Sequence, residues 1–98
     1  LGAELIEPRL RELAEENVAI ADVRGIGLFW AVEFNADATA MAAGAAEFKE
    51  RGVWPMISGN RFHIAPPLTT TDDELVALLD AVEAAAQAVE LTFAGALF

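Results

Sequence analysis

The sequence contains no cysteine, and it has one histidine and one lysine among 98 residues. Without cysteine, the chain can form neither a disulfide bond nor a thiolate metal site. A single histidine without a cluster of carboxylates beside it cannot build a histidine-based zinc site. Basic residues are also few, because six lysines and arginines face 16 acidic residues and the formal net charge is −10. This charge repels a phosphate backbone, so we expect neither a metal site nor a nucleic-acid partner.

Long apolar runs are missing as well. No unbroken apolar stretch reaches the length of a transmembrane helix, and no basic amphipathic helix is available to bind anionic lipid. We therefore expect no membrane partner and a cytoplasmic location.

Apolar residues are nevertheless abundant and reach the end of the chain. They make up 55% of the sequence, above the roughly 45–50% of typical globular domains. The chain starts at Leu1 without an initiator methionine and ends with the apolar stretch "ELTFAGALF". Chain ends are normally polar and frayed, so an apolar end usually packs against another protein surface. We expect a piece of a longer protein; the alternative is a small protein whose tail folds back on its own core.

Two segments in the first half have the spacing of amphipathic helices. In residues 1–17, Pro8 either kinks the helix or starts a second one, and Asn17 is expected to close it. In residues 35–52, Asp37 is the expected N-cap and Gly52 the C-terminal cap. Gly44 lies in the middle of this second helix, where glycine costs about 1 kcal/mol relative to alanine, and close packing usually compensates for that cost.

The third predicted helix has the clearest start signal. Thr71 and Glu74 fit a capping box, and Asp72 and Asp73 complement the positive end of the helix dipole. A continuous apolar stripe follows, formed by Leu75, Leu78, Leu79, Val82, Ala86 and Val89.

The segments between the helices read as two pairs of strands. In "VAIADVRGIGLFWAVEF", Gly25 and Gly27 indicate a tight reversal, and residues 28–34 alternate with apolar side chains on both faces. This alternation predicts a central strand with cover on each side. In "VWPMI", "SGN" and "RFHIA" we expect a strand, a three-residue turn and a strand, and Pro55 places the first of these at a sheet edge or at a bulge.

The predicted order is thus α, β, β, α, β, β, α in one domain covering residues 1–98. Strand pairs between helices predict an α+β fold, with helices covering a small antiparallel sheet of three to four strands.

No catalytic residue is predicted within this chain. Lys49 lies on the polar side of a surface helix, where nothing would desolvate it as a nucleophilic lysine requires. Ser58 lies in a turn. The two glycines of "RGIGLF" lack the third glycine and the following helix of a dinucleotide-binding fingerprint.

Three residues are candidates for binding a substrate. Arg24 ends a strand, where it either pairs with a carboxylate such as Asp22 or Glu33, or grips an anion at the edge of a site. Arg61 and His63 share one face of a short strand, which is either a solvated polar face or the lining of a pocket that meets the polar end of a substrate. Pro66 and Pro67 fix an extended exit from this strand.

Several of these pieces coincide with one family. "DVRGIGLFWAVEF", then a helix, then "RGVWPMISGNRFHIAPPLTTTDDEL" resembles the C-terminal small domain of class III pyridoxal-phosphate-dependent aminotransferases. That family includes omega-amino acid, acetylornithine and 4-aminobutyrate transaminases. The resemblance extends from the first helix to about residue 90 and keeps the order of the elements.

The resemblance implies a two-domain enzyme of fold type I that forms a homodimer. Pyridoxal phosphate and the lysine that binds it would belong to a large domain outside these residues, and the small domain would close over an amine and a keto acid. Some family members carry a carboxylate-gripping arginine directly before "APxL", where this chain has His63 and Ile64, with Arg61 two positions earlier. Others have an arginine near the position of Met56, which cannot grip an anion, so the substrate class stays open.

Two other readings follow from the residues alone. The chain could be a free-standing small-ligand or regulatory α+β module, in which case a start codon would lie close to Leu1. It could also be an interaction domain that dimerises through its apolar tail, and deleting residues 91–98 would then change the oligomeric state without changing the fold.

Overall fold

The computed structural model describes residues 3–53, 56–67 and 69–97. Its elements follow the predicted order: α1 (Ala3–Glu16), β1 (Ile20–Ile26), β2 (Phe29–Phe34), α2 (Ala38–Glu50), β3 (Met56–Ser58), β4 (Arg61–Ile64) and α3 (Asp72–Leu97). The four strands form one antiparallel sheet in the order β1-β2-β4-β3. The predicted α+β fold is confirmed. Pro8 lies inside α1, which is a single helix.

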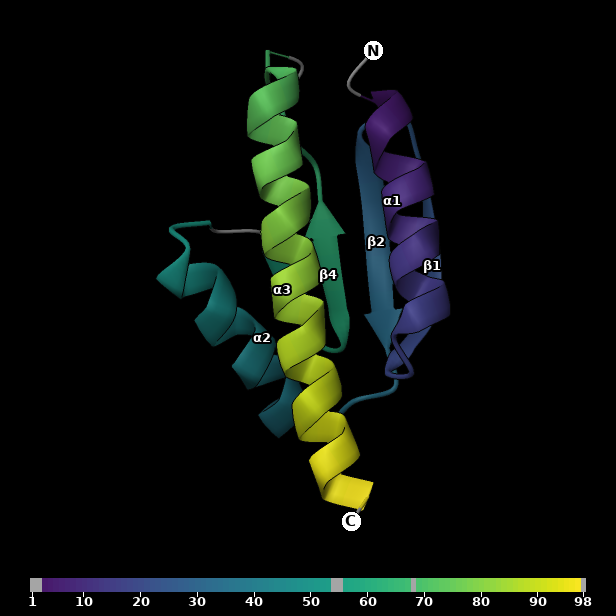
Figure 1. The fold of residues 1–98 in the computed structure, drawn as a ribbon, viewed down its shortest axis with the longest axis vertical. Helices are drawn as coiled ribbons and strands as arrows, with labels where there is room; N and C mark the ends of the chain where they lie inside the picture. Colours follow the sequence, from purple (N-terminus) through teal and green to yellow (C-terminus); the bar gives the residue numbers. More distant parts are fainter. Residues whose placement is uncertain (1–2, 54–55, 68, 98) are drawn as a thin grey trace.

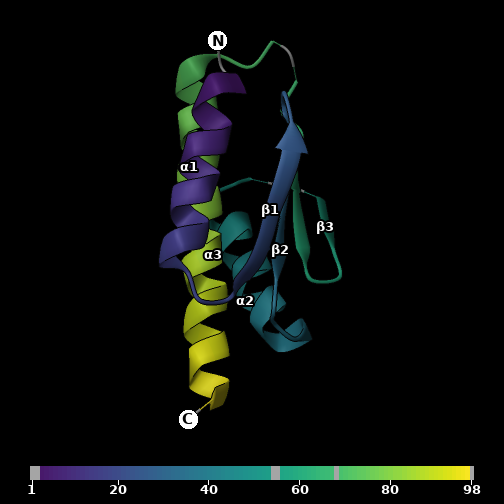
Figure 2. The ribbon, with the colours of Figure 1, turned by 90° about the vertical axis from the view of Figure 1, so that its right-hand side faces the viewer.

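All three helices lie on the same face of the sheet (Figures 1 and 2). β2 is central, as predicted, and its side chains Trp30, Val32 and Phe34 are buried under the helices. The helices in the described ranges cover only this face, and Phe29 on the other face is 58% exposed, so the predicted cover on the second face stays a prediction. Alternating apolar side chains indicate that a strand can be covered on both faces; they do not say which part of a protein covers each one.

Three phenylalanines form the centre of the core. The ring of Phe62 in β4 lies 4.7 Å from that of Phe34 in β2 and 4.9 Å from that of Phe48 in α2. Gly44 of α2 packs against the same cluster, since a Cβ at this position would lie 2.9 Å from Phe62 Cζ and 2.7 Å from Val89 Cγ2. Close packing of Gly44 is therefore confirmed, and it lets α2 approach both the sheet and α3.

The turn between β1 and β2 consists of Gly27 and Leu28, which corrects the predicted position of the reversal. Gly27 has a φ of 60°, a value that suits glycine at the first position of a two-residue hairpin turn. Gly25 instead lies within β1, paired with Trp30. Trp30 donates its indole N–H to the Gly27 carbonyl at 2.8 Å, which ties the ring to the turn.

β3 is an edge strand, as the sequence predicted, although Pro55 itself lies outside the described residues. The turn that follows contains two residues, Gly59 and Asn60, and not the three predicted. Asn60 donates its side-chain N–H to the Phe34 carbonyl at 2.7 Å, and its own carbonyl accepts from the Phe34 N–H. These two bonds join the hairpin to the end of β2.

The predicted caps are present. The Asp37 side chain accepts from the Ala40 N–H at the start of α2, and Gly52 follows this helix with a φ of 72°. At the start of α3, the Thr71 N–H donates to Glu74 Oε1 at 3.0 Å and the Glu74 N–H donates to Thr71 Oγ1 at 3.2 Å. The reciprocal bonds form a capping box.

α3 runs to Leu97, so most of the apolar end of the sequence continues this helix. Leu91 is 75% exposed, whereas Phe93 packs partly against the core. Phe98 lies outside the described residues. None of the helices in the described ranges is long and apolar enough to cross a membrane.

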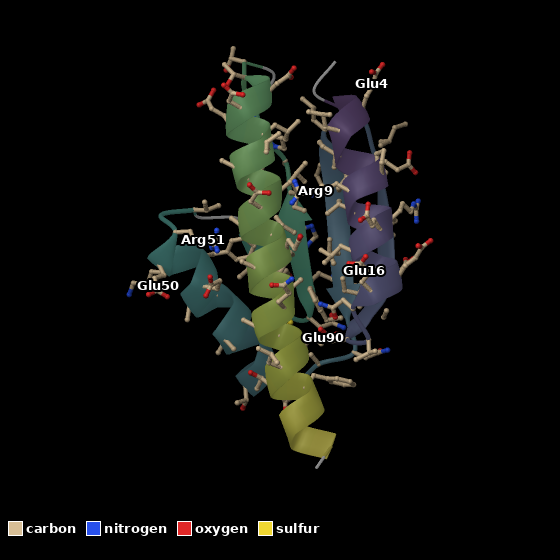
Figure 3. The ribbon with its side chains drawn as sticks, in the orientation of Figure 1. Glu4, Arg9, Glu16, Glu50, Arg51 and Glu90 are labelled. Atoms are coloured by element: carbon tan, nitrogen blue, oxygen red, sulfur yellow. The ribbon has the colours of Figure 1, made fainter. Side chains whose placement is uncertain are left out.

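Polar contacts join α1 to α3. Arg9 of α1 points toward α3 (Figure 3), and its Nη2 lies 2.6 Å from Asp80 Oδ1. Asn17, just after α1, is buried; its side chain donates to the Ala86 carbonyl and accepts from the Ala19 N–H, both at 2.9 Å. Asn17 therefore both closes α1, as predicted, and holds α3 next to the start of β1.

The capping box makes a testable contribution to acid stability. The Thr71 N–H donates a hydrogen bond to the carboxylate of Glu74 and holds the pKa of Glu74 below its ordinary value of 4.5. A carboxyl group whose pKa is lower in the folded than in the unfolded protein stabilises the fold at pH values above the unfolded-state pKa. This stabilisation is lost as the pH falls through the folded-state pKa. We expect Glu74→Gln to weaken the loss of stability on acidification. Urea unfolding at a series of pH values checks this, with Glu12→Gln in the middle of α1 as the control; equal pH profiles for the two variants would contradict it.

Candidate functional site

The three candidate binding residues lie on the face of the sheet opposite the helices. The strand register places Arg24 and His63 on either side of Ala31, and Glu33 opposite Arg61. Two strand spacings, or roughly 10 Å, therefore separate the backbones of Arg24 and His63. The predicted common face of Arg61 and His63 is present.

The guanidinium of Arg24 forms ion pairs with two carboxylates. Its Nη1 lies 2.8 Å from Asp22 Oδ2 and its Nη2 lies 2.9 Å from Glu33 Oε1. The hydrogen bonds that Arg24 donates to Asp22 and Glu33 raise the pKa of Arg24 above its ordinary value. These are the carboxylate partners predicted for a structural arginine, and an incoming anion would compete with both.

Arg61 is partly buried, and its register neighbours are Glu33 on β2 and Ser58 on β3. Its Nε is buried and has no hydrogen-bond partner among the described residues. A buried donor without an acceptor costs free energy. An acceptor supplied from outside the described residues would remove that cost.

His63 lines a hollow of about 360 Å³ at the rim of the sheet. Its ring meets that of Phe29 edge to face, with 6.4 Å between the centroids. Met56 is its register neighbour on β3 and is 70% exposed. The described lining consists of Phe29, Val53, Met56, His63, Ile64, Ala65, Pro66 and Leu78.

The hollow thus separates the three candidates. His63 lies in it with Met56 and Phe29, whereas Arg24 and Arg61 are not part of its lining. Sequence reasoning did not assign Phe29, Val53 or Leu78 to a site. The alternation in residues 28–34 placed Phe29 on the same face as Ala31 and Glu33, and that was the only available signal. Val53 and Leu78 are brought to the rim by the end of α2 and the start of α3, contacts that no local pattern contains.

Lys49 and the possible metal ligands of the described residues lie as follows. Lys49 is exposed in the last turn of α2 and does not line the hollow. Within the described ranges, no three His, Asp or Glu side chains gather as metal ligands. The geometry supports recognition of a small molecule, with a single imidazole at an apolar surface.

The sequence matches the family model described as aminotransferase class-III over residues 1–86. The chain belongs to the class III aminotransferases. Enzymes of this class depend on pyridoxal phosphate, and one of the similar structures described below contains it. The resemblance found in the hairpin and "APPL" motifs is thereby confirmed. No curated protein sequence matches significantly.

Solved structures of transaminases share this fold. A transaminase with L-alanine superposes with a TM-score of 0.80 at 26% identity, over 94% of this chain and 24% of its own. An amine transaminase from an uncultivated Pseudomonas species, in its pyridoxal-phosphate-bound form, gives 0.76 at 33% identity, over 88% and 21%. The acetylornithine aminotransferase from Elizabethkingia anophelis gives 0.77 at 26% identity, over 88% and 22%. This class III chain spans about a quarter of the length of the transaminases it matches.

Proposed function

We propose that residues 1–98 are the C-terminal small domain of a transaminase that transfers an amino group from an amine or amino-acid donor to a keto acid. In that reaction the donor carbon is oxidised to a carbonyl while the keto acid is reduced to an amino acid. The domain closes over the substrate and is inactive alone. The observation that supports this most directly is the hollow at His63, which lies at the rim of the uncovered sheet face in a chain of this family.

The uncovered face supports a large domain as the partner. Ile26 is 84% exposed, Met56 70% and Phe29 58%, all on the side of the sheet away from the helices. Exposed apolar side chains that gather on one face mark interaction sites. We assign this face to the large domain of the same chain, in a cytoplasmic homodimer of fold type I.

Pyridoxal phosphate belongs to that large domain in the proposed enzyme. Lys49 is the single lysine of the sequence, and its exposed position on α2 does not fit a cofactor-binding lysine. We therefore assign cofactor binding to the large domain, and binding and enclosing the substrate to the residues of this chain.

We assign substrate contacts to His63, Arg61 and Arg24, in decreasing order of availability. His63 already lines the hollow, and Arg61 has a buried Nε without an acceptor among the described residues. Arg24 would have to release Asp22 or Glu33 before it could bind an anion.

Kinetics of the full-length protein that contains these residues test the proposal. We expect transamination by that protein and none by residues 1–98 with added pyridoxal phosphate. His63→Ala should raise KM roughly 2- to 12-fold, the effect of losing one hydrogen bond. Arg51→Ala is the control, because Arg51 lies at the end of α2 (Figure 3), where it pairs with Glu47. Activity of the 98 residues alone would refute the assignment of catalysis to the large domain. An inactive full-length protein would refute the proposed function and favour a ligand-binding module.

A further inference from the structure

We infer that Asn60 is a positioning residue for substrate binding: its side chain fixes the place of β4 against β2, and with it the place of His63. This inference rests on the proposed function, in which His63 contacts the substrate, and it names a further residue on which that contact depends.

The hairpin that carries His63 is short and has a sheet neighbour on one side only. β3 has three residues and lies at the edge of the sheet (Figure 2), so β4 is the strand that joins the hairpin to β2. The ladder between β2 and β4 contains four residue pairs. The position of His63 therefore depends on a small number of hydrogen bonds.

Asn60 extends this ladder through its side chain. The register of β2 and β4 continues beyond the four pairs to Phe34 and Asn60. The Phe34 N–H donates to the Asn60 carbonyl at 2.8 Å, and Asn60 Nδ2 donates to the Phe34 carbonyl at 2.7 Å. Opposed residues of an antiparallel ladder can exchange two bonds between their backbones. Here an amide side chain supplies one of the two bonds, and it closes the ladder at the turn.

The backbone conformation of the turn does not itself require asparagine at this position. The preceding Gly59 has the positive φ of the turn, 58°, and no described residue other than glycine has a positive φ. Glycine at the first central position is typical of a type II′ hairpin turn, in which the second position has an ordinary negative φ. Asn60 is also exposed. Asn60→Ala therefore removes the side-chain bond without straining the turn.

Asn60 acts at a distance from the hollow. It is not among the described lining residues, and it lies three residues before His63, about 10 Å along the strand. A binding group has to be held within about 0.5 Å of its productive position by the element that carries it. Loss of the bond at one end of a four-residue strand loosens that strand, so the effect should appear as weaker substrate binding.

Steady-state kinetics of the full-length protein test the inference with two variants. Asn60→Ala removes the amide group, and Asn60→Asp keeps its shape but replaces the N–H donor with an oxygen. We expect both to raise KM for the amine donor about threefold or more, up to the effect of His63→Ala. We expect kcat to change less than about twofold, since a change in KM alone reports lost substrate binding.

Asn17→Ala is the matched control. Asn17 likewise donates a side-chain N–H to a backbone carbonyl, that of Ala86, but it is buried, and its bond joins the end of α1 to α3 and not to the hairpin. Because its loss leaves a buried acceptor without a partner, Asn17→Ala should lower the free energy of unfolding more than Asn60→Ala does. At a temperature where circular dichroism shows both variants folded, its KM should stay within about 1.5-fold of the wild-type value.

A double variant tests whether Asn60 acts through His63. Residues that act through one contact are not additive, so Asn60→Ala should raise the KM of His63→Ala by less than about 1.5-fold. An equal effect of Asn60→Ala with and without His63 would overturn the inference.

The other outcomes separate this inference from the proposed function. A rise in KM for Asn17→Ala equal to that for Asn60→Ala would trace the effect to stability and overturn the inference. Loss of folding in both Asn60 variants, or an unchanged KM in Asn60→Asp, would overturn it as well, and all of these results leave the proposed function standing. Conversion of no amine or amino acid by the wild-type protein would overturn the proposed function and this inference together.

Discussion

Replacing Phe62 with alanine is expected to lower the free energy of unfolding by about 3–5 kcal/mol. Phe62 is fully buried, and its ring contacts both Phe34 and Phe48. Its removal leaves a cavity between β4 and α2, in addition to the lost burial of the ring. Since domains are stable by only about 5–15 kcal/mol, this single change takes a large share of the total.

Chemical denaturation of the 98-residue chain measures this loss. Phe29→Ala is the matched control, because Phe29 is a phenylalanine of the same sheet that remains 58% exposed on the opposite face. We expect it to cost less than 1 kcal/mol, as surface substitutions usually do. Similar losses for Phe29→Ala and Phe62→Ala would contradict the one-sided core.

Replacing Gly25 with alanine is expected to destabilise the fold by roughly 3 kcal/mol, at the upper end of the usual cost of overpacking. A Cβ at this position would overlap the Phe29 carbonyl oxygen and lie 2.5 Å from Trp30 Cδ2 and 2.7 Å from Trp30 Cα. Two of these three atoms belong to the backbone of β2, so relief requires β1 and β2 to move apart. The gain of about 0.5–1 kcal/mol from replacing a strand glycine is too small to offset this.

Gly27→Ala separates crowding from backbone conformation. Apart from Gly27 itself and its two chain neighbours, no described atom lies within 4 Å of a Cβ built on Gly27, but its φ of 60° is left-handed, which costs roughly 1–2 kcal/mol for other residues. Thermal or urea unfolding should therefore rank Gly25→Ala as the more damaging change. The reverse order would contradict the close contact between Trp30 and Gly25.

Local signals in the sequence predicted the fold because they depend on residues close in the chain. Asp37 caps α2 and Thr71 pairs with Glu74, and each of these interactions spans three residues. Gly25 was different: as the partner of Trp30 it lies in a strand, although its spacing from Gly27 resembled a turn. Its requirement for glycine comes from the ring of Trp30 across the ladder, which no local pattern encodes.

The candidate site was predicted less completely for the same reason. Alternation correctly put Arg61 and His63 on one face of β4, but it could not place one of them in a hollow and the other outside. That difference depends on where Val53, Pro66 and Leu78 meet at the rim, and these residues come from three separate segments. The two ion pairs of Arg24 were anticipated from the proximity of Asp22 and Glu33 in a hairpin.

The buried amide of Asn17 has a consequence for biosynthesis. Its partner, the Ala86 carbonyl, lies 69 residues later in the chain, so at about 5–20 residues per second the ribosome needs about 3–14 seconds to supply it. Until then α1 and β1 lack the hydrogen bond from Asn17 to α3. Their apolar side chains stay exposed to water or bound by a chaperone. The domain therefore matures as one unit after its last helix has been made, and not strand by strand during translation.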